Sequence, residues 1–492
     1  MITISFEKRG AIGLCEHIYN SIKSQILNGT LKANEKLPSK RSLAENLGVS
    51  VITVQNAYAA LISEGYIYSI EKKGFFVTEL RIDSGIEIDS FSPSNDTRRL
   101  SSSKPQNTTS TLGDFENLNH QNIFCDFQSN STNYEKFPFS LWSHTMRQVL
   151  NSGDEKLLKR VGVKGVLELR SSISKYLREF RNMDILPEQI VIGAGTENLY
   201  SLVVQFLGRE NLFAVENPGY HKISSVIELN GAKTIPVTID EEGISISELE
   251  KSAANVAHVS PNHHFPTGIV MPIRRRQEIL AWSEKSEKRF IIEDDYDSEF
   301  RFNGKPLSTL FSSDKSGKVI YINTFSKTLA PSFRISFMVL PMQLLHCFEK
   351  QFGLYSCPVS SFEQFTLSRF INDGNYGKHI IRMKNFYRTL RNALISAIQS
   401  SDFSKNCKIQ EEESGLHFLL TIKSAHSAAK LEKRLSEQKI NLPLLSNFYY
   451  KNENTLNKNE ENCEKTFVVN YSGIKKEKIA EIIQRLEKAF KN

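Results

Sequence analysis

The chain has 492 residues, of which 40% are hydrophobic and 24% are charged, the usual balance of globular proteins. This length predicts two or more domains. No run approaches the ~20 apolar residues that span a bilayer, and the N-terminus lacks the apolar core of a signal peptide, so we expect a cytoplasmic protein with no membrane partner. The six cysteines show neither metal-ligand nor disulfide spacing, which predicts no metal site.

Residues 1–80 form the first predicted domain. Apolar residues recur at helical spacing over residues 13–28, and two shorter helices begin near Ser39 and Ser50. The segment YIYSIEKKGFFVTEL then alternates like a β-hairpin with two lysines at its tip. Three helices and a two-stranded wing predict a winged helix-turn-helix. The domain carries nine Lys and Arg against seven Glu, a net charge of only +2, so DNA binding must depend on local geometry.

Residues 81–135 are rich in Ser, Asn, Thr and Asp and show little hydrophobic periodicity, which predicts a flexible linker. From residue 136 to 492, short apolar strands alternate with helices, the pattern of an α/β domain with a mostly parallel sheet. From about residue 358 the pattern changes to a long helix, short strands and a final amphipathic helix. This change predicts a smaller C-terminal α+β subdomain.

Polar residues follow several of these strands, where open α/β sheets bind ligands. GAGTE (193–197) joins a strand to a helix, and its small residues and Thr196 hydroxyl suit a phosphate, although a capped turn is the alternative. RFIIEDDYD ends in carboxylates, one of which would keep a pyridine nitrogen protonated if buried beside it. Tyr296 follows and could donate to a phenolic oxygen, with an ordinary acidic loop as the alternative.

Lys327 lies in NTFSKTLAPSFR, after a further apolar strand. A partly desolvated lysine loses its proton readily and can form a Schiff base with a carbonyl group. Arg334 offers a planar fork of donors to a phosphate, and the hydroxyls of Thr324 and Ser326 add further bonds. For an isolated Ser-Lys pair, a solvated surface lysine is the alternative interpretation.

These segments occur in one order: a phosphate turn, an aromatic residue after NPG, a PTG turn, Asp-x-Tyr, and Lys with Arg seven positions later. That order resembles the fold type I pyridoxal-phosphate enzymes of the aspartate aminotransferase superfamily. Because the domain follows a GntR-type winged helix, the chain resembles the MocR/GabR family of bacterial regulators. The similarity is most specific in LPSKRSLAENLGVS, ENPGYH, IIEDDYDSEFRF and FSKTLAPSFRISFMVLP.

The resemblance implies pyridoxal 5'-phosphate as cofactor, bonded to Lys327, with Asp294 at the pyridine nitrogen. Side chains implied around the phosphate and ring are Gly195, Thr196, Thr324, Ser326, Arg334, Tyr296 and Tyr220. Implied contacts to operator DNA come from two helices and the wing, namely Ser39, Arg41, Ser50, Thr53, Gln55, Asn56, Lys72 and Lys73.

The chain also departs from the family pattern. Val51 replaces an Arg common at the start of the recognition helix, and Phe265 stands where aminotransferases carry an Asn. His264 stands where Gln is common, so His263 and His264 are candidate pocket residues, with a structural role as the alternative, and His264 is a candidate effector residue. The C-terminal segments INLPLLSNFYY and TFVVNYSG contain no Arg to clamp a substrate carboxylate. Lys222 could supply a cation there, with less selective geometry.

We therefore expect a transcription regulator that senses pyridoxal phosphate, or its adduct with an amino compound, and controls vitamin B6 or amino acid and amine metabolism genes. The missing clamp favours pyridoxal phosphate itself as the small-molecule effector. The alternative is an active pyridoxal-phosphate-dependent aminotransferase with a DNA-binding appendage. The resemblance also implies a head-to-tail homodimer on a repeated operator.

Overall fold

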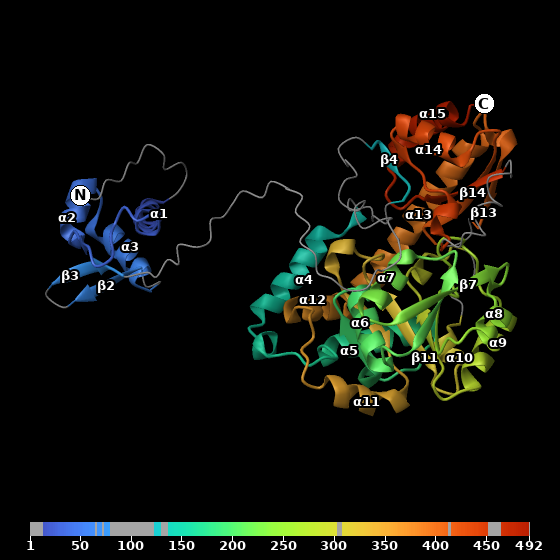
Figure 1. Ribbon diagram of the computed structural model, residues 1–492, viewed down its shortest axis with the longest axis horizontal. Helices are drawn as coiled ribbons and strands as arrows, with labels where there is room; N and C mark the ends of the chain where they lie inside the picture. Colours follow the sequence, from blue (N-terminus) through green and yellow to red (C-terminus); the bar gives the residue numbers. More distant parts are fainter. Residues whose placement is uncertain are drawn as a thin grey trace, which may run out of the picture. The chain divides into compact units, whose positions relative to one another are not determined.

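The computed structural model describes residues 13–63, 66–70, 73–78, 123–128, 136–302, 308–411, 415–450 and 464–491. They fall into two compact units, separated between residues 109 and 110, and each unit is described by itself (Figure 1). Lys72 and most of the predicted linker lie outside the described residues. Within the described ranges, no helix is long and apolar enough to cross a membrane.

The N-terminal unit is the expected winged helix-turn-helix. Its elements are α1 (Leu14–Leu27), β1 (Lys36–Leu37), α2 (Lys40–Leu47), α3 (Val51–Ser63), β2 (Ile67–Ile70) and β3 (Gly74–Val77). The buried faces of the three helices form one core, whose fully covered residues include Ile18, Ile22, Val54, Ala57, Tyr58 and Leu61. β1 adds a third strand to the wing by pairing with β3, and two residues are too few to show a strand period in the sequence.

An eight-stranded sheet forms the centre of the C-terminal unit. Its strands are β5 (Ile190–Gly193), β6 (Leu212–Asn217), β7 (Lys233–Asp240), β8 (Gly243–Ile244), β9 (Val256–Val259), β10 (Phe290–Asp294), β11 (Val319–Thr324) and β12 (Ser336–Val339). Their order is β5-β12-β11-β10-β9-β6-β7-β8, and the pairs from β11 through β7 are parallel. β12 runs antiparallel between β11 and β5. The mostly parallel α/β architecture is confirmed.

Helices cover both faces of this sheet because its strands are apolar on both sides. One face packs against α4 (Phe139–Asn151), α5 (Leu167–Arg181), α8 (Ile246–Lys251), α9 (Ile273–Glu284), α10 (Leu310–Ser313) and α12 (Ser361–Asn372). The opposite face packs against α6 (Thr196–Leu207), α7 (His221–Leu229) and α11 (Met342–Phe352). Along β11, Val319 and Tyr321 point to the first face, whereas Ile320 and Ile322 point to the second.

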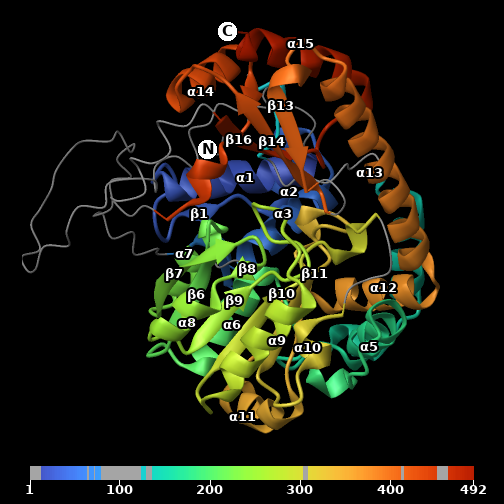
Figure 2. The ribbon, with the colours of Figure 1, turned by 90° about the vertical axis from the view of Figure 1, so that its right-hand side faces the viewer.

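A second, smaller core lies at the C-terminal end of the chain. Its elements are β13 (Cys407–Gln410), β14 (His417–Lys423), β16 (Glu464–Asn470), α13 (Asn375–Gln399), α14 (Ala428–Glu437) and α15 (Ile479–Phe490). Figure 2 shows the long α13 reaching from α12, beside the large sheet, to this small sheet. Because α12 packs into the core of the large sheet, the small core begins within α13, later than the expected boundary at residue 358.

One segment of the predicted linker is part of this small subdomain. β4 (Cys125–Asp126) pairs in parallel with β15 (Ile440–Asn441), and the Phe127 side chain is 1% exposed in the small core. The polar composition of residues 81–135 concealed so short a strand, because composition averages over a whole segment. The folded unit therefore includes residues 123–128, ahead of the expected start at residue 136.

Phe127→Ala tests whether this segment is structural. The change should lower the free energy of unfolding of the C-terminal unit by about 3–5 kcal/mol, because it leaves a cavity in the small core. Urea titration followed by circular dichroism measures the loss. Gln128→Ala removes only an exposed side chain that accepts one hydrogen bond from Asn441 Nδ2 at 3.2 Å, so it should shift the midpoint far less. Equal midpoints for both variants and the parent would show that residues 123–128 do not contribute to the fold.

Candidate functional site

A cavity of about 250 Å³ lies where the carboxyl ends of β5, β6, β9, β10 and β11 meet. Every one of these strands contributes a lining residue at or just after its last position. The cavity is lined by ten of the residues selected from the sequence: Thr196, Tyr220, Lys222, His264, Asp294, Tyr296, Thr324, Ser326, Lys327 and Arg334. The remaining one, Gly195, lies directly beneath the Arg334 side chain.

Asp294 ends β10 and presents one free oxygen. Its Oδ2 accepts a hydrogen bond from the Tyr200 hydroxyl at 2.7 Å, and the same hydroxyl lies 2.8 Å from His258 Nε2. Because a phenol carries one hydrogen, the imidazole must be the donor in the second bond. Asp294 Oδ1 is buried and has no hydrogen-bond partner. An unpaired buried acceptor is costly, so this oxygen suits a ligand that brings a donor such as a protonated ring nitrogen.

Lys327 lies three residues beyond the end of β11. Burial lowers the pKa of its amine to about 8, although the negative charges of Asp297 and Asp294 act in the opposite direction. An appreciable fraction of this amine is therefore neutral near pH 7, and a neutral amine is the nucleophilic form. The side chain has the character needed to attack a carbonyl group.

Another part of the cavity wall is built from hydrogen-bond donors. Gly195 precedes α6 with φ +85°, and a Cβ at this position would lie 2.6 Å from the guanidinium carbon of Arg334. Only glycine therefore allows the guanidinium to approach the helix N-terminus. Ser326 Oγ is buried with no hydrogen-bond partner, whereas Thr324 Oγ1 accepts from Ser336 Oγ at 2.8 Å and from the Ser326 amide at 3.1 Å. Such a donor set is suited to a phosphate.

Glu197 forms ion pairs with two cationic side chains in this part of the cavity. One carboxylate oxygen is paired with Arg334, and the other is paired with Lys222. Partial burial raises the pKa of Glu197, but the hydrogen bond and charge of Lys222, together with Arg334, outweigh this effect and hold the pKa below its ordinary value. The carboxylate therefore stays ionised and competes with any anion for the same two cations.

His264 lies in a buried pair with Glu216. Its Nδ1 is 2.7 Å from Thr267 Oγ1, and its Nε2 is 3.4 Å from Glu216 Oε2. Burial raises the pKa of Glu216 to about 8 and lowers the pKa of His264 to about 3. Both groups are therefore largely neutral at pH 7, and His264 offers an effector a hydrogen bond but no positive charge.

Two tyrosines complete the walls. The Tyr220 ring meets Phe265 edge-on with 5.6 Å between centroids, and its 40% exposure leaves a face open to the cavity. The Tyr296 hydroxyl lies 3.2 Å from His263 Nδ1, which is also 2.8 Å from Asp297 Oδ2.

Five ionisable lining residues were missed by the sequence-based selection: Glu197, Tyr200, Glu216, His258 and Tyr450. Two had a usable signal, since Glu197 follows the Thr196 turn and Glu216 precedes the NPG segment. The others come from a helix, a strand interior and the small subdomain, where no local pattern marks them. In the described part of the chain, Arg334 is the one arginine that lines the cavity, consistent with the absence of a C-terminal carboxylate clamp.

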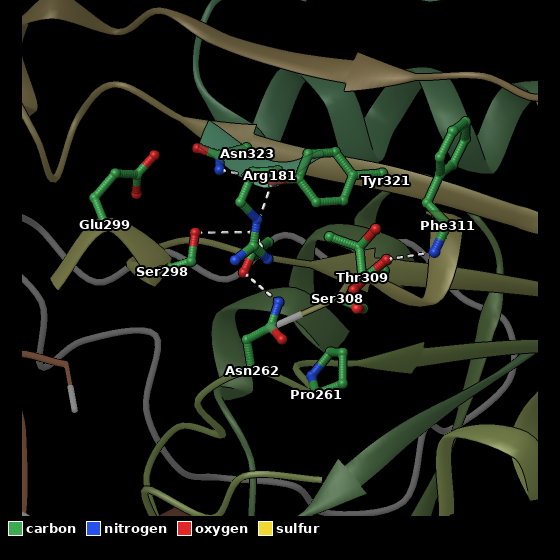
Figure 3. Close-up of polar contacts among 12 residues, drawn as sticks. Arg181, Pro261, Asn262, Ser298, Glu299, Ser308, Thr309, Phe311, Tyr321 and Asn323 are labelled. Carbon is green, nitrogen blue, oxygen red and sulfur yellow. Dashed lines mark hydrogen bonds and ion pairs between the residues drawn. The ribbon is translucent and has the colours of Figure 1, made fainter. Parts of the chain in front are cut away.

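Behind β10, a buried polar network holds the adjacent Asp295. Its Oδ2 pairs with Arg181 Nη2 at 2.7 Å and accepts from the hydroxyls of Tyr321 and Ser298 at 2.7 and 3.0 Å, while Oδ1 accepts from Asn262 at 2.7 Å. Figure 3 shows these side chains converging from separate segments. Both members of the ion pair are 1% exposed. Because Arg181 is 114 positions from its partner, no motif could have revealed the contact.

In the N-terminal unit, two of the expected DNA-contacting serines are helix caps. Ser39 Oγ accepts from the Ser42 amide at 3.1 Å, and Ser50 Oγ accepts from the Thr53 amide at 3.1 Å. The hydroxyls of Ser50 and Thr53 also bond to each other at 2.7 Å. The side chains of four further candidates are exposed: Arg41, Gln55, Asn56 and Lys73.

Two protein families match the chain. Bacterial regulatory proteins of the gntR family match residues 14–77, and aminotransferase class I and II matches residues 124–486. The second match includes the β4 segment and every residue that lines the cavity.

Two relatives match along almost the whole chain, and a third matches along most of it. An uncharacterised HTH-type transcriptional regulator, YdeL of Bacillus subtilis, is 33% identical over 98% of this chain and 97% of its own. The probable rhizopine catabolism regulatory protein MocR of Rhizobium meliloti is 29% identical over 96% and 93%. The pyridoxine biosynthesis regulator PdxR of Corynebacterium glutamicum is 27% identical over 81% of each chain.

Among solved structures, Pyrococcus horikoshii kynurenine aminotransferase, crystallised with PMP, superposes with a TM-score of 0.64. It covers 75% of this chain and 91% of its own at 24% identity, a likeness of fold.

The buried Arg181–Asp295 pair can be tested against an exposed pair on the same helix. Arg181→Met should reduce the free energy of unfolding by about 3–5 kcal/mol, because it leaves a buried carboxylate uncompensated. Arg178, which pairs with Asp184 at 2.9 Å in solvent, provides the control. Arg178→Met should not shift the urea midpoint measurably. If the two variants lost equal stability, the buried network would not be a constraint on the fold.

Proposed function

Because the chain belongs to the MocR/GabR subfamily of gntR-family transcription regulators, with an aminotransferase class I and II domain, we propose that it binds pyridoxal 5'-phosphate through Lys327 and uses it as a signal. The observation that carries the proposal is one cavity whose lining residues include three buried polar atoms without a hydrogen-bond partner: Asp294 Oδ1, Ser326 Oγ and His264 Nε2. The first two are satisfied by a ligand that has a ring nitrogen and a phosphate.

When bound, pyridoxal 5'-phosphate supplies an aldehyde that bonds to an amine and a pyridine ring that withdraws electrons from that bond. Lys327 supplies the amine, which burial keeps partly neutral. Asp294, oriented by Tyr200, holds a proton at the ring nitrogen. Tyr220 offers a ring face for stacking, and Tyr296 offers a hydroxyl for the ring oxygen. The phosphate is held by Arg334, Ser326, Thr324 and the helix start at Gly195 and Thr196.

The signal we propose is the cofactor itself. Lys222 is already paired with Glu197, and His264 is neutral, so neither is available as a strong carboxylate ligand. An amino acid effector would therefore lack a bidentate clamp in the described part of the cavity. One relative is named as a regulator of pyridoxine biosynthesis, which supports vitamin B6 genes as the regulated class.

The alternative function is an aminotransferase that also binds DNA. Lys327, Asp294 and Arg334 fit the first half-reaction, and the aminotransferase fold favours it. Sustained conversion of an amino acid and a keto acid by the purified protein would support the enzyme. Conversion that stops after one equivalent of amino acid per site would support the sensor.

We further propose a head-to-tail homodimer. Two neighbouring loops of the C-terminal unit expose large apolar side chains, with Leu158 at 82% and Leu354 at 89% exposure. The loops are held together by Arg160, whose Nη2 donates to the Leu354 carbonyl at 2.6 Å. An apolar patch on adjoining loops is suited to an interface with a second copy. Two N-terminal winged helix-turn-helix units, which we call the heads, would then meet a repeated operator. The contacts are those expected of Ser39, Arg41, Ser50, Thr53, Gln55, Asn56, Lys72 and Lys73.

Lys327→Ala should abolish the visible absorption band that a lysine-bound pyridoxal phosphate gives, while Lys222→Ala, in the same cavity, should retain it. With the parent protein, the rate at which the band appears should rise about tenfold per pH unit below pH 8 and level off above it, because only the neutral amine reacts. Stopped-flow absorbance at a fixed low cofactor concentration measures this rate. A rate independent of pH between 6 and 9 would contradict the assignment of Lys327.

The proposed effect of pyridoxal phosphate on DNA binding can be measured separately from cofactor binding. Fluorescence anisotropy with DNA from the region upstream of the gene should give different affinities with and without pyridoxal phosphate, and Lys327→Ala should remove the difference. If the parent protein formed the band but its DNA affinity did not respond, the cofactor would not be the signal.

Glu197→Gln should tighten pyridoxal phosphate binding by about tenfold, equivalent to about 1.4 kcal/mol, because it removes an anion that competes for Lys222 and Arg334. Pyridoxal, which lacks the phosphate, should bind the parent and the variant equally. Equilibrium absorbance titration of both compounds gives the two dissociation constants. If the variant bound pyridoxal phosphate more weakly than the parent, or if its affinity for both compounds changed equally, Glu197 would not compete with the phosphate.

A further inference from the structure

The helix α3 carries no charged residue. Its sequence is VITVQNAYAALIS, and its inner positions Val54, Ala57, Tyr58 and Leu61 are fully buried against the head core. Its exposed positions Val51, Ile52, Gln55, Asn56 and Ala59 recur one, four, five and eight residues from the first. Residues at this spacing form a single continuous stripe. We call this stripe the outer face of α3.

We propose that the outer face of α3 reads A·T base pairs in the major groove, with Gln55 and Asn56 on adenine and Val51 and Ile52 against thymine methyl groups. Amide side chains form bidentate bonds with adenine N6 and N7, and the thymine methyl group accepts apolar contacts. Guanine is read mainly by Arg or Lys, and the outer face has neither. The side-chain chemistry of this helix thus matches one class of base pair.

Position along the helix supports the apolar contact. The Ser50 cap fixes the start of α3, so Val51 and Ile52 lie in its first turn. In helix-turn-helix proteins, the N-terminal residues of the second helix meet the base edges. Val51 is 42% exposed and Ile52 is 70% exposed, the highest value among large hydrophobic residues in the described head. Covering these aliphatic groups with thymine methyls removes apolar surface from water.

The positive charge of the head lies on other elements. Lys40 and Arg41 begin α2, and Lys73 is at the wing. These side chains suit phosphate contacts, which position a protein on the duplex without reading sequence. Affinity and sequence preference are therefore assigned to separate elements of the head. The inference depends on the DNA binding of the gntR family and not on the proposed cofactor.

The test begins by selecting duplexes from a random library with the full-length protein. The expected half-sites are made of A·T pairs at the positions under α3. Replacing each contacted thymine by uracil, which removes only the methyl group, should weaken binding about fourfold per methyl. Ile52→Ala should lose this sensitivity at the thymine that Ile52 contacts and keep it at the thymine that Val51 contacts. Ile62→Ala provides the matched control, since Ile62 is on the same helix but about 15 Å farther along it, and should behave like the parent.

A second set of variants distinguishes side chains that read the base sequence from side chains that position the protein on the duplex. Arg41→Ala should weaken binding to all sequences alike and reduce the salt dependence, as loss of a phosphate contact does. Val51→Arg should introduce a preference for guanine at one position of the half-site. Half-sites rich in G·C, or uracil-containing DNA bound as tightly as the thymine form, would overturn the proposal. Unchanged sensitivity to uracil in a folded Ile52→Ala protein, verified by circular dichroism, would overturn the part assigned to Ile52.

Discussion

The architecture of the C-terminal unit depends on two consecutive carboxylates at the end of β10, Asp294 and Asp295, which point to opposite faces of the sheet. Successive residues of a strand point to opposite faces, so Asp294 and Asp295 cannot share one environment. Asp295 is held by Arg181 and three neutral donors on the face covered by α5, α9 and α12. A charge buried so deeply has no low-energy alternative position, and it fixes the strand end. Asp294 is thereby directed to the α6 side, where Tyr200 orients it and one oxygen remains free.

The cavity wall has two parts of different character. Asp294 Oδ1 is an acceptor without a donor, whereas Arg334 and Lys222 share the Glu197 carboxylate. Burial leaves Glu216 and His264, which also line the cavity, largely without charge near neutral pH. The unpaired Asp294 oxygen suits a ligand with a protonated nitrogen, and a phosphate on that ligand would compete with Glu197 for Arg334 and Lys222. A free carboxylate would lack a bidentate clamp of its own, because Arg334 is the one arginine that lines the described part of the cavity. We propose that this difference favours binding of a cofactor over turnover of an amino acid.

How far the sequence predicted this arrangement depends on whether each residue acts through a local pattern. Lys327, Asp294 and the Gly195–Thr196 turn lie in short segments after strands, and each was selected from those segments. Glu197 was overlooked although it is adjacent to Thr196, because its role depends on Lys222 and Arg334 meeting it in space. Arg181 and Tyr200 are helix residues whose partners lie 114 and 94 positions away. Similarly, β1 and β4 are two-residue strands defined by their partners alone. Residues that act within a local motif can be predicted from the sequence, whereas contacts between residues far apart in the sequence become visible only in the folded structure.

The pairing of β4 with β15 places the first described residues of the C-terminal unit in the small subdomain. Residues 123–128 contribute to the small core and not to the large sheet. That subdomain also reaches the cavity: Tyr450 lines it, its amide donates to Asn217 Oδ1 at 3.0 Å, and the Gly219 amide donates to the Phe448 carbonyl at 3.0 Å. The segment 123–128 is therefore held by the same subdomain that contributes Tyr450 to the cavity wall. A truncation that removed these six residues would take a strand from a subdomain that borders the cavity, so the cavity and this segment share one structural support.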